Sequence, residues 1–471
     1  MTLLGGPWTP ERRLLTVGLI GLVTAAAFEG MAVPTVLPEL VRELGGLDLY
    51  GWAFSAFWLT NIIGITLAGS DADRRGPGRA LALGVVLFAA GMVVAGVASG
   101  MPLVIAGRAI QGFGSGAIGS VVYAAIARAY DPSARPRMIA LVSSAWVVPG
   151  LVGPALAGLV TDTIGWRWVF LGIVPPVLAM GMAVYPQLAR LEPAARVGRP
   201  PRWDTRRALD AVQLAVGSTM VIGALTVGAS PLAIPLAIAG AWLGLVALRH
   251  LLPSGSLRVA PGRPSVVVAV FAVAFAFFGT EAFVPLTVVE VRGGSVTLGG
   301  LALSAAAVTW GAGSWLQARA ATAGIRRRLV VAGAVLIGLG IGITSFVLLP
   351  ASPVWVAALG WGVAGLGMGL AYSMLALLVL ETSPAGEEGA SSAAIQLMFT
   401  LGTAFGAGAG GAVVALADAG VLDLVTALAI VNGIMAMAGL AGVAVATRVP
   451  SGPAPQAGAT VGQPTGVLEH S

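Results

Sequence analysis

Residues 14–38 read LLTVGLIGLVTAAAFEGMAVPTVLP, an apolar run with a single charged side chain, Glu29. A helix of about 20 such residues crosses the roughly 30 Å hydrocarbon core of a bilayer. Comparable runs recur along the 471-residue chain as far as residue 447. Charged residues make up 10% of the chain, against about 25% in soluble domains. The sequence therefore predicts an all-α polytopic membrane protein.

Fourteen segments are long and apolar enough to span a membrane. They fall at residues 14–38, 51–69, 80–99, 102–126, 138–161, 168–189, 208–228, 231–248, 265–290, 296–317, 329–349, 353–380, 391–416 and 424–447. If the N-terminus is cytoplasmic, 22 of the 26 arginines lie on the cytoplasmic side, as the positive-inside rule requires. Both termini are then cytoplasmic. The absence of lysine and the abundance of Ala and Gly suggest a bacterial genome rich in G and C, so we expect the bacterial inner membrane.

The composition also excludes several kinds of chemistry. The chain has no cysteine and only two histidines, His250 and His470, which leaves no disulfide, no Cys-ligated metal and no His-rich metal site. No HExxH, GxSxG or phosphate-binding GxxxxGK[ST] motif is present. We therefore expect no enzyme activity, no metal and no cofactor. The net charge of +6 reflects membrane topology, and we expect no nucleic-acid partner.

The chain contains a weak internal repeat. Residues 28–34 read FEGMAVP and residues 279–285 read GTEAFVP, so each first span of a half carries an acid four or five residues before a Val-Pro pair. Duplicated bundles around a midplane site are typical of secondary transporters. We therefore divide the chain into an N-terminal six-helix bundle with its linker (1–207), two additional helices (208–252), a C-terminal six-helix bundle (253–448) and a disordered cytoplasmic tail (449–471).

Four further motifs occur in a characteristic order. Residues 69–79 read GSDADRRGPGR, residues 108–112 RAIQG, residues 153–158 GPALAG and residues 166–170 WRWVF. Together with the acid of the first span, they resemble the motifs of the major facilitator superfamily, and within it those of the drug:proton antiporters with fourteen spans. Glu29 stands where that family's first-span motif has Asp.

This resemblance implies a fold of two pseudo-symmetric six-helix bundles plus two extra helices. It also implies a proton-coupled antiporter that exports amphipathic drugs or related small molecules by alternating access. Its energy source is the proton gradient, its partners are the substrate, protons and the bilayer, and we expect a monomer. Export of a lipid or an endogenous metabolite is the alternative function.

A carboxylate at membrane depth is by default a candidate functional group. At 1.5 Å rise per residue, Glu29 and Arg108 fall in the same layer of the N-terminal bundle, and Gln111 shares a helix face with Arg108. Burial favours the neutral form of a carboxylate and a nearby arginine favours the ionised form, so a balanced site can titrate. We predict that Glu29 carries the proton, with Arg108 and Gln111 completing the site. The alternative is a permanently paired structural carboxylate.

Glu281 falls near the membrane midplane in the C-terminal half. It is a candidate second titrating group or binder of a cationic substrate; alternatively, it faces a neighbouring helix and is held neutral by a hydrogen bond. Aromatic and polar side chains suit an amphipathic ligand. The predicted substrate-binding residues are Glu281, Trp58, Asn61, Tyr123, Trp146, Phe278 and Tyr372, although each of the aromatic and polar residues can equally serve packing.

A third group of residues is predicted to control conformation. Asp73 either caps a helix or pairs with an arginine, and the resemblance implies a latch between the bundles at the cytoplasmic side. Proline and glycine in the fifth span permit a bend and close contact with the other bundle. The predicted gating residues are Gly69, Asp73, Arg74, Gly76, Arg79, Gly153, Pro154 and Gly158.

Overall fold

The computed structural model describes residues 7–191, 205–228, 230–320, 324–384 and 387–450. Within them, 14 helices are long and apolar enough to cross a membrane. The predicted fourteen spans and all-α fold are therefore confirmed for this multi-pass membrane protein. The predicted linker residues 192–204 and most of the predicted tail, residues 451–471, lie outside the described residues, and the domain boundaries remain predictions.

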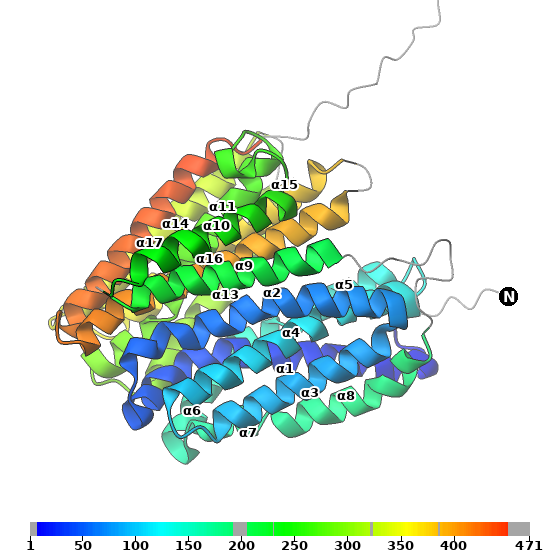
Figure 1. The fold of residues 1–471 in the computed structure, drawn as a ribbon, viewed down its shortest axis with the longest axis horizontal. Helices are drawn as coiled ribbons and strands as arrows, with labels where there is room; N and C mark the ends of the chain where they lie inside the picture. The colour runs from blue at the N-terminus through cyan, green and yellow to red at the C-terminus, as the bar shows by residue number, and fades with distance from the viewer. Residues whose placement is uncertain (1–6, 192–204, 229, 321–323, 385–386, 451–471) are drawn as a thin grey trace, which may run out of the picture.

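The helices of the N-terminal half are α1 (Pro10–Leu44), α2 (Tyr50–Arg75), α3 (Pro77–Gly96), α4 (Met101–Ala129), α5 (Arg135–Ser144), α6 (Val147–Ile164), α7 (Arg167–Leu171) and α8 (Val174–Ala189). They are followed by α9 (Thr205–Thr226), α10 (Ala233–Leu251), α11 (Arg263–Glu281), α12 (Val284–Leu286), α13 (Val296–Ala320), α14 (Arg326–Ser345), α15 (Val356–Glu381), α16 (Glu388–Asp418) and α17 (Leu424–Ala446). In Figure 1, α1–α4 and α6–α8 lie in the lower part of the view, α11 and α14–α17 lie in the upper part, and α9 and α10 lie in front.

Three predicted spans are interrupted rather than continuous. The span at 138–161 breaks between α5 and α6, the span at 168–189 breaks between α7 and α8, and the span at 265–290 breaks after Glu281 and ends in a π-helical turn, Thr287–Val291. Proline lacks the N–H that would bond four residues back. Pro149 and Pro285 accordingly follow the first and the last of these breaks, where they cannot donate to the carbonyls of Ala145 and Glu281.

Glycines position the central helices of each half in the same way. On α4 and α15 the small residues recur at a spacing of 253 residues, as Gly112, Gly114 and Gly116 against Gly365, Gly367 and Gly369. An added Cβ on Gly114 would lie 2.7 Å from the carbonyl oxygen of Gly84, and one on Gly367 would lie 2.5 Å from that of Gly333. Because backbone approaches this close exclude any side chain, the same contacts hold both bundles, which supports the predicted repeat.

Hydrophobic packing joins the two halves at one end only. Residues 32–40 of α1 share a core with residues of α11–α17. Residues 15–23 of α1 belong to a second core, built only from α1–α5, α8 and the turns between them. We call the end where α1 finishes the closed end. The opposite end, where α1 begins, carries the ion pairs of Arg12, Arg128 and Arg326, and we call it the basic end.

The extra pair of helices packs beside the bundles. α9 contacts α10, α2 and α16. Trp52 of α2 donates its indole N–H to Thr226 of α9 at 3.3 Å. At the basic end, His250 of α10 bonds Asp210 of α9 at 3.1 Å. These contacts tie α9 and α10 to each other and to the outside of both halves.

The glycine contacts predict a position-dependent effect of a single methyl group. At Gly107 an added Cβ would lie 2.6 Å from the backbone nitrogen of Ala95, whereas at Gly119 of the same helix it would meet no atom within 4 Å. Overpacking typically destabilises a protein by about 1–3 kcal/mol. Gly107→Ala should therefore lower the melting temperature in detergent, while Gly119→Ala leaves it unchanged or raises it. Equal effects of the two variants would contradict the packing described here.

Candidate functional site

The N-terminal half contains a buried ion pair. Arg108 of α4 donates from Nη1 to Oε1 of Glu29 on α1 and to Oε1 of Gln111, the latter at 2.8 Å. Glu29 is 1% exposed, Arg108 2% and Gln111 0%. The prediction that these three residues lie together in one layer is confirmed.

The side chains and backbone that surround Arg108 explain why a charge is tolerated there. Its Nε donates to the carbonyl oxygen of Ala53 at 3.0 Å. Its guanidinium also lies over the ring of Phe57, 4.2 Å from the centroid, a favourable cation–π arrangement. A buried charge requires a paired charge and further hydrogen bonds. Arg108 has a paired carboxylate, further hydrogen-bond acceptors and an aromatic face as partners. Its position is therefore fixed by α1, α2 and α4 together.

Two atoms of the same network remain unsatisfied. Oε2 of Glu29 and Nε2 of Gln111 are buried and have no hydrogen-bond partner among the described residues. A buried polar atom without a partner raises the free energy of the folded state. Next to Glu29, Gly30 borders open space, because an added Cβ would meet no atom within 4 Å. A proton on Oε2 would therefore occupy a free lone pair one residue from open space.

The C-terminal half contains a contiguous aromatic cluster. Phe399 of α16 lies 5.1 Å from both Phe278 of α11 and Tyr372 of α15, measured between ring centroids. Trp310 of α13 lies 6.1 Å from Tyr372. Trp58 of α2, from the other half, reaches Phe399 at 6.3 Å. Each of the five rings is only partly buried, so the cluster combines contact between the halves with accessible aromatic surface.

Three of these rings were predicted from the sequence and two were not. Trp58, Phe278 and Tyr372 were predicted to bind substrate, and the structure brings them together. Trp310 and Phe399 were not predicted. Trp310 occupies the position in the second half that Asn61 occupies in the first. The backbone carbonyl of Trp310 faces Gly369, as that of Asn61 faces Gly116. The internal repeat therefore offered a signal for Trp310.

Glu281 lies beside this cluster, at the end of α11. It is partly exposed, and its carboxylate lies near the indole of Trp361. That indole is buried, and its N–H forms no hydrogen bond with the described residues. Trp361 in turn stacks on Phe277, with centroids 4.7 Å apart, which connects Glu281 to the aromatic rings.

The remaining predicted binding residues lie elsewhere. Asn61 is buried, and its side-chain amide donates to the carbonyl oxygen of Gly112 at 3.3 Å, so it joins α2 to α4. Tyr123 on α4 and Trp146 at the α5–α6 break are exposed. Neither belongs to the ring contacts of the cluster.

At the basic end, Asp73 pairs with an arginine rather than capping α3. Its carboxylate accepts from Nη2 of Arg128 on α4 at 2.6 Å. Nη1 of Arg128 donates to the carbonyl oxygen of Ala72 at 2.8 Å. This pair lies within the N-terminal half, so the predicted latch between bundles is not formed through Asp73 in this conformation. The other predicted gating residues nearby are Gly69, Arg74, Gly76 and Arg79; Gly76 has φ +92° at the turn into α3, and Arg74 and Arg79 are exposed.

At the closed end, hydrogen bonds cross between the halves. Asp162 of α6 accepts from the backbone N–H of Thr297 at 3.0 Å and from its hydroxyl at 2.6 Å, and so caps the start of α13. Tyr50 donates to the carbonyl oxygen of Ala282 at 2.9 Å, beside the break in α11. Ser55 donates to that of Ala404 at 2.8 Å. None of these contacts was predicted from the sequence.

Two of the predicted residues of the fifth span, Pro154 and Gly158, lie at the same contact between the halves. An added Cβ on Gly158 would lie 2.5 Å from Cα of Thr297. Gly300 of α13 approaches the carbonyl group of Pro154. Gly153 faces Phe28 of α1, where a Cβ would make ordinary contact at 3.4 Å. Gly158 and Pro154 therefore allow α6 to approach α13 closely, while Gly153 tolerates a side chain.

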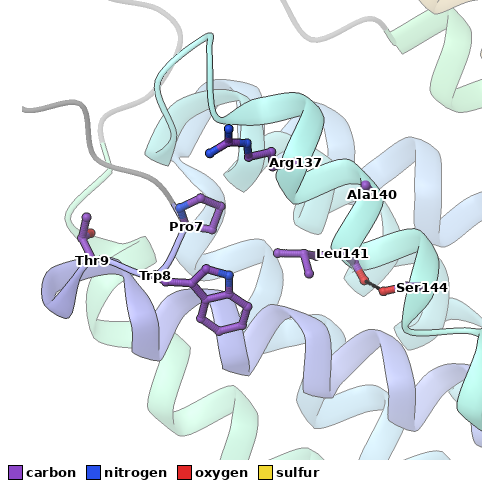
Figure 2. Close-up of a pocket in the computed structure, with 7 residues that line it drawn as sticks. All are labelled: Pro7, Trp8, Thr9, Arg137, Ala140, Leu141 and Ser144. Carbon is purple, nitrogen blue, oxygen red and sulfur yellow. Dashed lines mark hydrogen bonds between the residues drawn. The ribbon is translucent and has the colours of Figure 1, made fainter.

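A separate pocket of about 780 Å³ lies at the basic end between the N-terminal segment and α5. Figure 2 shows Pro7 and Trp8 on one side of it and Arg137, Leu141 and Ser144 on the other. None of the lining residues belongs to the ion pair or to the aromatic cluster. The pocket is therefore not part of the candidate site.

Comparison with known proteins gives a consistent result. A model of the Major Facilitator Superfamily matches residues 18–407. The chain is 30% identical over 433 residues to an uncharacterised MFS-type transporter of Mycobacterium tuberculosis, which covers 87% of this chain but only 60% of that protein. It is 26% identical over 444 residues to a probable multidrug-efflux transporter of the same organism, covering 90% and 92% of the two chains.

Solved structures show the same fold at low identity. A D-xylose–proton symporter matches with a TM-score of 0.65 at 17% identity, covering 93% of this chain and 98% of the other. A bacterial homologue of the human lysosomal transporter Spinster, in an inward-facing and unoccupied conformation, matches with a TM-score of 0.62 at 16% identity, covering 93% and 95%.

The contacts of Asp162 predict that it keeps the closed end shut. The chain has no cysteine, so spin labels at Asp48→Cys and Ala351→Cys would report the distance between the halves at this end. Asp162→Ala should add a longer-distance population, with an open-to-closed ratio raised about tenfold for a loss of about 1.4 kcal/mol.

The matched control is Asp423→Ala. Asp423 caps α17 within one half by accepting from the backbone N–H and hydroxyl of Thr426, and these two hydrogen bonds lower the pKa of its carboxyl. Its loss should leave the distance distribution unchanged. An identical distribution in the wild type and Asp162→Ala would show that Asp162 is not a latch.

Proposed function

The chain belongs to the major facilitator superfamily, and from this membership we propose that the transporter is a proton-coupled antiporter that exports amphipathic small molecules by alternating access. The observation that carries the proposal is the buried pair of Glu29 and Arg108. A relative described as a probable multidrug-efflux transporter supports the substrate class. The chain spans only 60% of the length of the uncharacterised relative. The proposed activity is therefore based on the residues of this chain and not on that relative.

We place the basic end in the cytoplasm, as the arginine distribution favours. The closed end then faces outward, and the conformation is inward-facing. In the alternate conformation, the bonds of Tyr50, Ser55 and Asp162 across the halves break. The halves then approach each other at the basic end. Tilting of two bundles around a midplane site is the motion by which duplicated transporters expose it to each side in turn.

Protonation of Glu29 would change the charge of the buried layer. With Glu29 ionised, the pair with Arg108 is neutral overall, and the layer can stay packed. With Glu29 neutral, Arg108 is left as an uncompensated buried cation, whose desolvation is unfavourable by several kcal/mol. Proton binding therefore favours a conformation in which water reaches Arg108. Differential stabilisation of two conformations is what coupling requires.

The different conformations favoured by ionised and neutral Glu29 give the transport cycle a direction. The packed, paired layer corresponds to the state after proton release to the cytoplasm, when substrate enters from that side. A proton from outside then binds Glu29 in the outward-facing state and drives release. Each charge that crosses gains about 2.3 kcal/mol per 100 mV of membrane potential. The free lone pair on Oε2 of Glu29 would receive the proton.

The aromatic cluster is the proposed substrate surface. Its rings come from both halves, Trp58 from the first and Phe278, Trp310, Tyr372 and Phe399 from the second. A partly exposed aromatic wall holds amphipathic ligands through apolar contact and stacking. Tilting of the halves separates Trp58 from Phe399, so ligand contacts at this surface differ between the two conformations.

The proposal predicts the behaviour of Glu29→Gln. Glutamine can keep the hydrogen bond from Arg108 but cannot titrate, so the variant should fold and insert while substrate-driven proton movement is lost. Proteoliposomes with an internal pH-sensitive dye measure that movement when amphipathic dyes are added. Glu29→Asp, which can still titrate, should retain coupling with a shifted pH optimum.

Glu39→Gln on the same helix is the matched control, because Glu39 forms an exposed ion pair with Arg42. Its proton movement should equal that of the wild type. Undiminished proton-coupled transport by Glu29→Gln would refute the proposal.

A further inference from the structure

A pocket of about 380 Å³ lies at the basic end, between the start of α14 and the end of α17. It is lined by Arg327, Arg328, Val331, Ala332 and Thr447. The two helices meet further along, where an added Cβ on Gly439 would lie 3.7 Å from Cα of Gly338. The helices on which α14 and α17 pack, α11, α15 and α16, all belong to the same half. The α14–α17 pocket therefore lies at the periphery of the C-terminal half, away from the contact between the halves.

Two guanidinium groups border this pocket without a charged partner. Three consecutive arginines begin α14, and the first of them, Arg326, pairs with Glu381. Within the described residues, Arg327 donates only to the carbonyl oxygen of Thr447, at 3.4 Å, and Arg328 forms no hydrogen bond or ion pair. Guanidinium groups bind phosphate through paired, charge-assisted hydrogen bonds. The pocket therefore presents two positive charges in a form that suits a phosphate.

The internal repeat identifies the corresponding place in the N-terminal half. Glycines of α3 and α14 that approach the central helix of their own half in the same way are 249 residues apart. Gly84 corresponds to Gly333, and Gly91 corresponds to Gly340. This register relates every residue at the start of α14 to one at the start of α3.

The residues that line the pocket differ from their counterparts in α3. Arg327 stands where α3 has Gly78, and Ala332 stands where it has Leu83. An added Cβ on Gly78 would lie 2.7 Å from Cα of Ala189, so the start of α3 closes onto the end of α8. The C-terminal half thus has a guanidinium and an opening where the N-terminal half has a direct backbone contact. The pocket is a feature of this half's own sequence and not of the shared bundle packing.

An apolar surface continues from the pocket along both helices. Val335 and Leu339 of α14 and Leu440 of α17 are exposed, and both helices are long and apolar enough to span a membrane. Basic pockets between membrane helices on the cytoplasmic side bind anionic lipid headgroups. The ammonium group of a zwitterionic lipid would add a third positive charge beside the two guanidinium groups. The pocket and the surface below it therefore fit a phospholipid with a net negative charge.

We propose that the α14–α17 pocket binds an anionic phospholipid of the leaflet at the basic end. Its phosphate lies between Arg327 and Arg328, and its acyl chains lie along α14 and α17. The lipid supplies the negative charge that the described residues do not. The site is separate from Glu29 and from the aromatic cluster, so it does not depend on the proposed transport mechanism.

The test measures which lipid contacts α14. The chain has no cysteine, so Val335→Cys can carry a single bimane fluorophore beside the proposed acyl chains. The full-length protein is reconstituted in phosphatidylcholine, which is replaced stepwise by phosphatidylglycerol or phosphatidylcholine with a doxyl quencher on one acyl chain. Attraction by the two arginines should let phosphatidylglycerol quench this label at a mole fraction at least about fivefold lower.

Val86→Cys is the matched control, because Val86 of α3 is the counterpart of Val335 and is also exposed. The two lipids should quench it within about twofold of each other, since the basic pocket is absent there. Replacing both pocket arginines by Arg327→Gln and Arg328→Gln should remove the preference at Val335→Cys. Arg249→Gln, which removes an exposed charge of α10 at the same end, should leave that preference intact.

Equal quenching by the two lipids at Val335→Cys, or a similar preference for phosphatidylglycerol at Val86→Cys, would overturn the proposal. A preference that survives the loss of both arginines would do the same. Excess inorganic phosphate at constant ionic strength should change nothing; if it abolishes the preference, the pocket binds a soluble anion and not a lipid. If the double variant cannot be reconstituted, the two labelled positions in otherwise unaltered protein still decide between the outcomes.

Discussion

A single interaction, the ion pair of Glu29 and Arg108, constrains the centre of the molecule. Both side chains are almost fully enclosed, and each makes the other tolerable in an apolar interior. The pair holds α1 against α4, while the carbonyl of Ala53 and the ring of Phe57 bring α2 into the same arrangement. Because removing one charge leaves the other uncompensated, the protonation state of one carboxyl is linked to the packing of three helices.

Close backbone contacts between helices transmit a change in the protonation of Glu29 to the whole bundle. Glycines on α4 and α15 pack each bundle so closely that neither deforms easily, and rigid bundles respond to a local change by moving as units. The halves share a core at the closed end and have separate surroundings at the basic end. Asp162, which reaches from α6 to the first residues of α13, lies where such a movement must begin.

Much of this was predictable from the sequence, for physical reasons. Apolar length located the spans, and helix rise placed Glu29 and Arg108 at one depth, which their contact confirms. A bend in the fifth span was predicted from its prolines and glycines, but the break after Glu281 was not, because a proline such as Pro285 is tolerated within many continuous membrane helices. The partners of Asp73 and Asp162 depend on how helices dock, and no periodicity encodes docking. Asn61 was predicted to face a ligand, yet it bonds Gly112 instead, since a polar residue serves packing and binding equally well.

The central claim is that the Glu29 carboxyl gains and loses a proton during transport. Infrared difference spectroscopy of the reconstituted protein observes this directly, because a protonated carboxyl has a C=O stretching band that an ionised one lacks. Addition of an exported substrate should change a carboxyl band that is present in the wild type and absent from Glu29→Gln. A substrate-induced spectrum without any Glu29-dependent carboxyl band, in protein that transports normally, would contradict the account.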